Sequence, residues 1–265
     1  MTPTPLLQLE NVQHIYSRGG LLGRRHVSAV DSVSLTISAE PPEVLAIIGE
    51  SGSGKTTLAR MILNIVPPTA GNIRFRGEVL HHGWRRRERL RFMRQVQPIF
   101  QNPFEAFNPL KRIDRYLFMT ARRFATGDVE QRADEALHQV GLSLVEVRQR
   151  YPHELSGGQL QRVAIARALI SAPALIVADE PVSMVDASLR MSIVALFSQL
   201  RDRLGVSIIY ITHDLATAYT ISDRIIIMRH GRVVETGAAR AVLDDPQHPY
   251  SQQLKGAVLS VDRTA

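Results

Sequence analysis

The sequence predicts an α/β fold with a mainly parallel sheet, and two observations carry this prediction. Short runs of β-branched and other aliphatic residues, which are typical of buried strands, recur along the chain. Longer segments with apolar residues at helical spacing lie between several of these runs. Strands that alternate with helices in this way are typical of parallel sheets covered by helices.

The expected elements follow in chain order. The strand-like runs lie at residues 27–37 in part, 44–48, 73–75, 175–178, 207–211 and 224–228. The helical patterns between them lie at residues 56–65, 158–170 and 188–204. The segment from about residue 102 to 153 lacks strand-like runs and is expected to form helices at 112–124, 129–140 and 144–150. We interpret this segment as a helical insertion.

Composition limits the class of protein. The 265 residues are enough for one large domain, or for one domain with a subdomain. With 45% hydrophobic and 22% charged residues, the chain is unlike disordered, collagen-like or coiled-coil proteins. The absence of cysteine excludes disulfides, thiolate metal sites and a cysteine nucleophile.

Charge and apolar stretches bear on location. No apolar stretch approaches the roughly 18 residues of a membrane span, and the first ten residues do not resemble a secretory signal. We therefore expect the chain to stay in the cytosol. A formal net charge of +7 suits nucleic acid, nucleotide phosphates or an anionic membrane surface, and it does not choose among them.

The strongest motif is a phosphate-binding loop at residues 49–56, which read GESGSGKT and match G-x-x-x-x-G-K-[ST]. A predicted strand precedes it and a predicted helix follows it, which is the context that the motif requires. The glycines allow successive backbone N–H groups and the helix N-terminus to face a phosphate. Lys55 is expected to approach the β- and γ-phosphates, and Thr56 to offer its hydroxyl to Mg²⁺. A glycine-rich turn with a surface lysine is the weaker alternative.

Two carboxylates, Asp179 and Glu180, end the predicted strand at residues 175–178. Strand ends of parallel sheets open onto the ligand crevice, so Asp179 is expected to hold the Mg²⁺ shell while Glu180 polarises an attacking water. A solvated acidic turn is the alternative. The phosphate-binding loop upstream favours the first interpretation, because such enzymes need an acidic site for their metal.

A third motif, Ser156-Gly157-Gly158-Gln159, begins a predicted helix, where the serine can cap the helix or bond a phosphate oxygen. Lying between a phosphate-binding loop and an Asp-Glu strand, this motif closely resembles the signature of ABC-transporter ATP-binding subunits. The resemblance covers nearly the whole chain.

The remaining family motifs follow in order. In this family, an aromatic ring at the position of Tyr16 stacks on adenine, and the glutamine loop begins at the position of Gln101. Asp186 follows the Asp-Glu strand, and His213 lies at the next strand end. Each residue alone would be an ordinary strand or loop residue. By resemblance, His213 would bridge the γ-phosphate and Glu180, and Gln101 would touch Mg²⁺ and water.

The resemblance implies a site for ATP and Mg²⁺. Its catalytic residues would be Glu180, His213 and Gln101, and its metal ligands Thr56, Gln101 and Asp179. The nucleotide-binding residues it implies are Tyr16, Gly49, Ser51, Gly52, Ser53, Gly54, Lys55, Thr56, Thr57, Ser156, Gly157, Gly158, Gln159 and Asp186. Many relatives read Pro-Thr-Ser-Ala-Leu-Asp where this chain has Pro-Val-Ser-Met-Val-Asp at residues 181–186, which bears on interface packing.

The resemblance also implies a fold and its division. We expect a P-loop NTPase core with a mainly parallel sheet, an N-terminal antiparallel β subdomain and a helical insertion. The core would comprise residues 1–101 and 154–245, the helical subdomain residues 102–153, and a C-terminal tail residues 246–265.

Two further segments resemble the oligopeptide, dipeptide and nickel importer branch of this family: Gln-Asn-Pro at 101–103 with Phe-Asn-Pro at 107–109, and Asp-Pro-Gln-His-Pro-Tyr at 245–250. Such a chain would hydrolyse ATP to drive uptake of peptides, nickel or oligosaccharides. Its implied partners are two membrane-spanning permeases, a second ATPase subunit, identical or different, and an extracytoplasmic substrate-binding protein. It would lie on the cytoplasmic face of the inner membrane.

Alternatives remain beside the importer hypothesis. One is a soluble member of the same superfamily that acts on nucleic acid or ribosomes, although the chain lacks the long insertions or fused second domain of such proteins; we expect no nucleic-acid partner. The other is a module that binds ATP without turnover, against which Glu180 and His213 argue. Residues 85–94 are arginine-rich and are interpreted as a solvated helix face. Phe104, Phe107 and Leu110 fit a permease-docking groove and core packing equally well.

Overall fold

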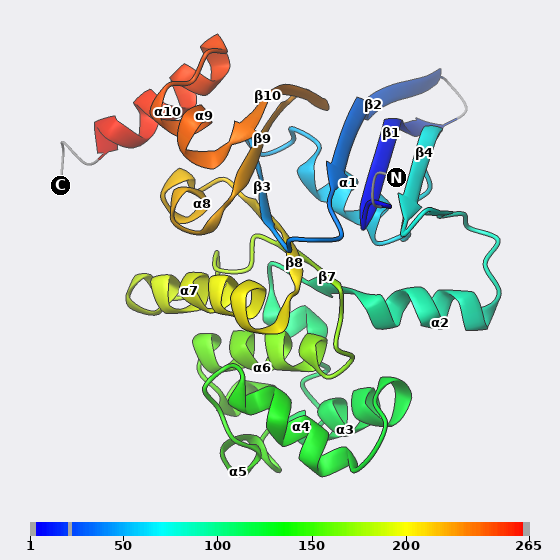
Figure 1. Cartoon of the computed structure of the whole chain (residues 1–265), viewed down its shortest axis with the longest axis vertical. Helices are drawn as coiled ribbons and strands as arrows, with labels where there is room; N and C mark the ends of the chain where they lie inside the picture. The colour runs from blue at the N-terminus through cyan, green and yellow to red at the C-terminus, as the bar shows by residue number, and fades with distance from the viewer. Residues whose placement is uncertain (1–3, 21–22, 262–265) are drawn as a thin grey trace. The chain divides into compact units, whose positions relative to one another are not determined.

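The computed structural model describes residues 4–20 and 23–261, and it divides the chain into two compact units. The first unit comprises Met1–Trp84 and Ile209–Ala265, and the second comprises Arg85–Ile208. Both units combine strands with helices, which confirms the predicted α/β class (Figure 1). The domain boundaries expected at residues 102 and 153 remain a prediction.

An antiparallel sheet begins the first unit. Its strands run in the order β2-β1-β4-β5 and are β1 (Leu7–Gly20), β2 (Gly23–Ile37), β4 (Ala70–Phe75) and β5 (Glu78–Val79). Leu7 of β1 lies opposite Ile37 on one side and Phe75 on the other, and all three side chains are buried. Alternate residues of these strands therefore form one apolar face, as expected for a sheet that is covered on one side.

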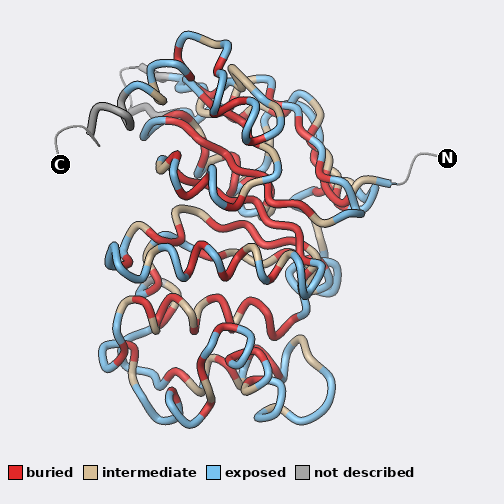
Figure 2. Tube along the Cα trace, turned by 60° about the vertical axis from the view of Figure 1, so that its left-hand side comes forward, coloured by how far each residue is buried: buried red, intermediate tan, exposed pale blue. Residues whose placement is uncertain are grey.

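The second group of strands in the first unit runs in the order β10-β9-β3-β8. These strands are β3 (Val44–Ile48), β8 (Ser207–Thr212, in this unit from Ile209 onward), β9 (Arg224–Arg229) and β10 (Arg232–Ala238). β3 is parallel to β9, and β10 pairs with β9 as an antiparallel hairpin. Every residue of β3 is buried, which explains why this segment is an unbroken aliphatic run (Figure 2).

The described residues of the first unit form four helices: α1 (Lys55–Ile62), α8 (Leu215–Ile221), α9 (Ala239–Asp244) and α10 (Pro249–Val261). Apolar residues of α8, α9 and α10 join a core cluster that includes Ala46 and Ile48 of β3, Leu215 of α8, Val242 of α9 and Tyr250 of α10. The segment expected as a C-terminal tail thus contains a helix whose first turn is part of the core.

The second unit consists mainly of helices, with two parallel strands. Its elements are α2 (Arg86–Gln95), β6 (Val96–Ile99), the 3₁₀ helix η1 (Pro103–Ala106), α3 (Ile113–Phe124), α4 (Val129–His138), α5 (Leu144–Val147), η2 (Pro152–Glu154), α6 (Gly157–Leu169), β7 (Leu175–Asp179) and α7 (Ala187–Leu204). Helices therefore fill the segment that was predicted as a helical insertion.

Several predicted helix ends are wrong by a few residues. The pattern predicted a first helix that reaches Ile65, but α1 ends at Ile62 because Asn64 adopts a left-handed φ of 54°. The amide of Ile65 then donates to the carbonyl of Arg60, which closes the helix end. Likewise α5 ends at Val147, shortly before Gln149 adopts a φ of 64°.

The arginine-rich segment forms α2, of which Phe92 is the buried residue. The arginine side chains of α2 thus lie on its exposed faces, in line with the interpretation as a solvated helix. Among the residues that the structure describes, no helix is both long and apolar enough to span a bilayer.

Candidate functional site

The phosphate-binding loop connects β3 to α1 in the first unit, as its flanking patterns predicted. Gly54 is the N-cap residue of α1 and has a φ of 105°. A Cβ atom at Gly54 would lie 2.2 Å from the carbonyl oxygen of Ala29, so glycine is required here both for conformation and for space. The amide of Gly231 donates to the carbonyl of Ser53, which ties the loop to the β9–β10 turn.

Lys55 is 5% exposed, and its ammonium group folds back over the loop. The Nζ atom donates to the carbonyl oxygens of Gly49 at 2.6 Å and Glu50 at 2.9 Å. It also lies 3.4 Å from the hydroxyl of Ser53. The loop backbone thus places a buried positive charge at the N-terminus of α1, where anions are favoured.

Tyr16 of β1 lies beside this loop. Its hydroxyl is 3.5 Å from the hydroxyl of Thr57, and its ring packs edge-on against His14 with centroids 4.4 Å apart. The Tyr16 side chain is 39% exposed, so part of the ring remains open to solvent. The structure therefore places Tyr16 beside Thr57, the residue that follows the phosphate-binding loop, and its stacking on adenine remains a prediction.

His213 follows directly after β8 and is exposed. The next residue, Asp214, caps α8 by accepting the backbone amides of Ala216 and Thr217. The cap fixes the backbone that carries His213 at the end of its strand. This position is the strand end that the sequence predicted for His213.

In the second unit, Gln101 and Glu180 meet. β6 and β7 are parallel, with Ile99 opposite Ala178, so the residues that follow these two strands emerge at the same edge. The Gln101 amide nitrogen donates to a carboxylate oxygen of Glu180 at 2.9 Å. Two residues that lie far apart in the sequence therefore form one polar pair next to Asp179, the last residue of β7.

The backbone at Glu180 is unusual for a residue with a side chain, because its φ is 48°. Ser183 holds this turn by donating both its amide and its hydroxyl to the Glu180 carbonyl, at 3.2 and 3.0 Å. Strained backbone of this kind is concentrated at functional sites, where it aims a side chain. Here it directs the carboxylate that Gln101 contacts.

Ser156 and Gln159 form a capping box at the start of α6. The Ser156 hydroxyl accepts the Gln159 amide at 3.2 Å, and the Gln159 side chain accepts the Ser156 amide at 3.0 Å. The capping interpretation of Ser156 is thus confirmed for this structure, and a phosphate contact remains a prediction. The helix begins with exposed or half-buried groups at Ser156 and Gly157.

Residues 181–186, where this chain departs from the family pattern, form the turn between β7 and α7. Val182 and Val185 are each 4% exposed, whereas Met184 is 59% exposed. The three residues that differ from the family pattern are therefore two core side chains, Val182 and Val185, and one surface side chain, Met184. Asp186 lies at the N-cap position of α7.

The loop after Gln101 contains three apolar residues, Phe104, Phe107 and Leu110, for which the sequence left core packing and a docking surface equally open. The structure shows that they differ in burial. Phe107 is 2% exposed and packs edge-on against Tyr116, and the Arg167 guanidinium lies 5.7 Å from its ring centroid. Burial lowers the pKa of Arg167 from its ordinary value. Phe104 and Leu110, by contrast, are 47% and 84% exposed. Phe107 belongs to the core, and the other two remain candidates for a docking surface.

One residue at the phosphate-binding loop was not expected from the sequence motifs. The backbone amide of Glu50 donates to the hydroxyl of Tyr250 at 3.0 Å, and Tyr250 is itself buried. Burial raises the pKa of the Tyr250 phenol, which keeps the group neutral at physiological pH. Tyr250 ends the Asp-Pro-Gln-His-Pro-Tyr segment, which resembles one branch of the family.

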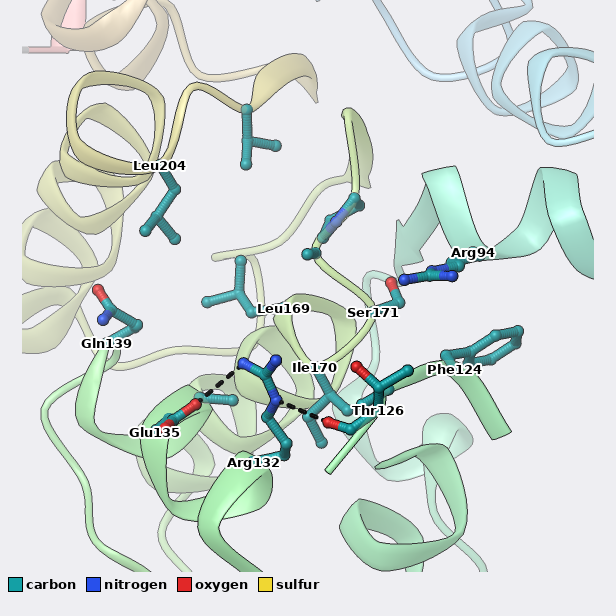
Figure 3. A pocket seen from close by; sticks show the side chains of 15 residues that line it. Arg94, Phe124, Thr126, Arg132, Glu135, Gln139, Leu169, Ile170, Ser171 and Leu204 are labelled. Atoms are coloured by element: carbon teal, nitrogen blue, oxygen red, sulfur yellow. Dashed lines mark hydrogen bonds and ion pairs between the residues drawn. The ribbon is translucent and has the colours of Figure 1, made fainter. Parts of the chain in front are cut away.

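The second unit also contains a pocket. A pocket of about 290 Å³ is lined by residues such as Arg94, Phe124 and Arg132, and the Arg132 guanidinium bonds Glu135 and the Thr126 carbonyl (Figure 3). None of its lining residues is a predicted site residue. Within residues 4–20 and 23–261, no three histidine or acidic side chains are arranged to hold a metal ion by themselves.

Comparisons with known proteins point to one family. The sequence model of the family described as ABC transporter matches residues 30–183. A putative peptide import ATP-binding protein of Brucella ovis is 40% identical over 269 residues, which cover 100% of this chain and 82% of that protein. A second one, of Brucella abortus, is 40% identical over 246 residues, covering 92% of this chain and 73% of its own length.

Solved structures agree with these relatives. The structure of cbiO1 from Clostridium perfringens superposes with a TM-score of 0.78 at 26% identity. The match covers 91% of this chain and 92% of cbiO1, which is described as part of the ABC transporter complex cbiONQ. A dimeric ATP-binding cassette in a post-hydrolysis state, bound to ADP and Pi, gives a TM-score of 0.76 at 28% identity, covering 88% of this chain and 99% of its own.

Proposed function

We propose, because the chain belongs to the ABC transporter family, that it is the ATP-hydrolysing subunit of an importer whose cargo is peptides. The observation that carries the mechanism is the pair formed by Gln101 and Glu180 at the ends of neighbouring strands, in a chain that also carries the phosphate-binding loop. The names of the Brucella relatives favour peptides over nickel or oligosaccharides. They also favour an importer over an ATPase that acts on nucleic acid.

ATP would be held by the first unit. The backbone amides of residues 49–57 and the α1 N-terminus would surround the phosphates, with the Lys55 ammonium on the β- and γ-phosphates. The Tyr16 ring would stack on adenine, for which its partly open face and its position beside Thr57 are suitable. In the nucleotide-bound state Lys55 would exchange a carbonyl partner for phosphate oxygen.

Mg²⁺ would be bound through Thr56, Asp179 and Gln101. One hydroxyl, one carboxylate and one carboxamide oxygen are hard ligands of the type that Mg²⁺ prefers, and the remaining positions would be filled by phosphate oxygens and water. Bound Mg²⁺ would neutralise charge on the transferring phosphoryl group.

Glu180 would act as the general base. A carboxylate accepts the proton of a water as that water attacks the γ-phosphate, and the bond from Gln101 orients the carboxylate. Gln101 would also touch the water, and His213 would contact the γ-phosphate and Glu180.

The second half of each site would come from another ATPase subunit, identical or different. Ser156, Gly157, Gly158 and Gln159 begin a 13-residue helix whose N-terminus suits a phosphate. Asp186 would contribute from the turn before α7. A single chain would present its phosphate-binding loop to one nucleotide and its Ser-Gly-Gly-Gln motif to a second nucleotide. ATP hydrolysis would therefore require a dimer.

The remaining partners would be two membrane-spanning permeases and, through them, an extracytoplasmic binding protein. The chain would lie as a peripheral subunit on the cytoplasmic face of the inner membrane. Residues 102–153 would act as the helical subdomain that meets a permease, joined to the core formed by residues 1–101 and 154–245 and followed by the segment 246–265.

The docking surface would include Phe104 and Leu110, which are exposed. Phe104 directly follows Pro103, which lines a cavity of about 260 Å³ together with Phe100 and Ala106, among others. Since Gln101 directly precedes this loop, a change at the γ-phosphate could move the docking surface and the permease with it. We expect Phe104→Glu to abolish peptide uptake by the assembled transporter and to leave ATP hydrolysis by the isolated ATPase subunits within about twofold of wild type.

The matched control is Ile65→Glu, which places the same charge on an apolar residue outside residues 102–153 that is 52% exposed. Uptake is measured in vesicles with labelled peptides, nickel and oligosaccharides as separate cargoes. Unchanged uptake by Phe104→Glu would remove Phe104 from the docking surface. Uptake of nickel or sugar alone by the wild-type transporter would contradict the proposed cargo.

A further inference from the structure

A single peptide unit in the phosphate-binding loop is held from both sides. Its carbonyl, that of Gly49, accepts the Lys55 ammonium at 2.6 Å, and its amide, that of Glu50, donates to the Tyr250 hydroxyl at 3.0 Å. The carbonyl and amide of one peptide unit are rigidly opposed, because the peptide bond is planar. The hydrogen bond to Tyr250 restricts rotation of this peptide unit. It therefore also restricts rotation of the Gly49 carbonyl, which accepts the hydrogen bond from Lys55.

The Tyr250 ring is fixed in place by its surroundings. It is 1% exposed and belongs to the same core cluster as Ala46 and Ile48 of β3, the strand that leads into the loop. The Arg229 guanidinium lies 4.7 Å from its ring centroid. A Cβ atom at Gly49 would lie 2.3 Å from the carbonyl of Met228, the residue before Arg229, so the loop also touches the end of β9.

The backbone around Tyr250 is anchored independently of the loop. The Glu235 carboxylate of β10 accepts the backbone amides of Gln247 and His248, one on each oxygen, at 2.8 and 3.1 Å. The His248 ring nitrogen Nδ1 in turn lies 3.1 Å from the Tyr250 amide and caps α10. Burial raises the pKa of Glu235, but the nearby Ser251 hydroxyl and the hydrogen bonds from these two amides outweigh it and hold the pKa below its usual value.

We infer that Tyr250 is a positioning residue for ATP binding, which acts through the Gly49–Glu50 peptide on Lys55. The segment 245–250 then has a function of its own: it carries a hydroxyl from the C-terminal helix to the back of the phosphate-binding loop. Loss of this hydroxyl leaves the Glu50 amide without the acceptor that orients it, and the loop samples conformations in which Lys55 is misplaced. This inference rests on the proposed phosphate-binding function of Lys55.

The test is Tyr250→Phe, which removes the hydroxyl and keeps the ring. We expect the KM for MgATP and its Kd to rise about tenfold while kcat at saturating ATP changes by less than about twofold. The matched control is Tyr116→Phe, because the Tyr116 hydroxyl accepts the Asn108 amide at 2.7 Å, a bond of the same kind in the second unit. The control is expected to keep wild-type ATP affinity in the isolated chain.

A double-mutant cycle with Lys55→Ala separates positioning from general stability. If Tyr250 acts through Lys55, adding Tyr250→Phe to the Lys55→Ala variant changes the ATP affinity no further. Wild-type affinity in Tyr250→Phe, equal losses in both tyrosine variants, or an unfolded Tyr250→Phe beside a folded control would each overturn the inference. Wild-type affinity in Lys55→Ala itself would instead overturn the proposed phosphate site.

Discussion

Glu180→Gln is expected to lower kcat for ATP hydrolysis by about a thousandfold or more, which equals a loss of about 4 kcal/mol in transition-state stabilisation. The amide keeps the shape of the carboxylate but cannot accept a proton from water. It can still accept the hydrogen bond from the Gln101 nitrogen, so the local arrangement survives. ATP affinity is therefore expected to remain, and the variant to accumulate as an ATP-bound dimer.

The measurement combines phosphate release at saturating MgATP with the size of the complex by light scattering. Glu130→Gln is the matched control, since Glu130 lies on α4 and forms an exposed ion pair with Arg148 at 2.9 Å. Near wild-type hydrolysis by Glu180→Gln would show that Glu180 is not the base. Loss of ATP binding along with turnover would assign Glu180 to the binding of nucleotide.

Lys55→Ala is expected to weaken MgATP binding by about a hundredfold, because it removes a charge-assisted hydrogen bond to phosphate from a buried position. The affinity is measured by calorimetry on the isolated chain. Lys111→Ala, which removes an exposed lysine of the second unit, is expected to bind as the wild type does. Equal affinities of the two variants would contradict the assignment of the phosphate loop.

The pattern of apolar residues in the sequence predicted fully buried strands well. The run at residues 44–48 is fully buried and gave the bounds of β3 without error, because such a strand tolerates no polar residue. The same reasoning failed at the end of α1, where periodicity continues to Ile65 but the backbone turns at Asn64. It also missed β10, whose residues are exposed or half-buried and show little pattern.

In the candidate site, the sequence likewise predicted some residues and not the contacts between them. The family resemblance predicted Gln101, and the end of a buried strand predicted Glu180, as separate functional residues; the parallel pairing of β6 with β7 explains why they meet. Motifs alone did not separate Phe104 from Phe107, because exposure depends on which residue meets Tyr116 and Arg167. The Tyr250 bond joins residues that are 200 positions apart, and no local pattern encodes such a contact.

We propose that this chain hydrolyses ATP at sites shared between two ATPase subunits. A direct test of this proposal is phosphate release per subunit, measured over about a hundredfold dilution with sedimentation of the same samples. We expect the specific activity to fall on dilution in step with the dimer fraction, and to become insensitive to dilution once the partner ATPase and permeases are assembled with the chain. Full specific activity from a dilute monomer would contradict the shared site.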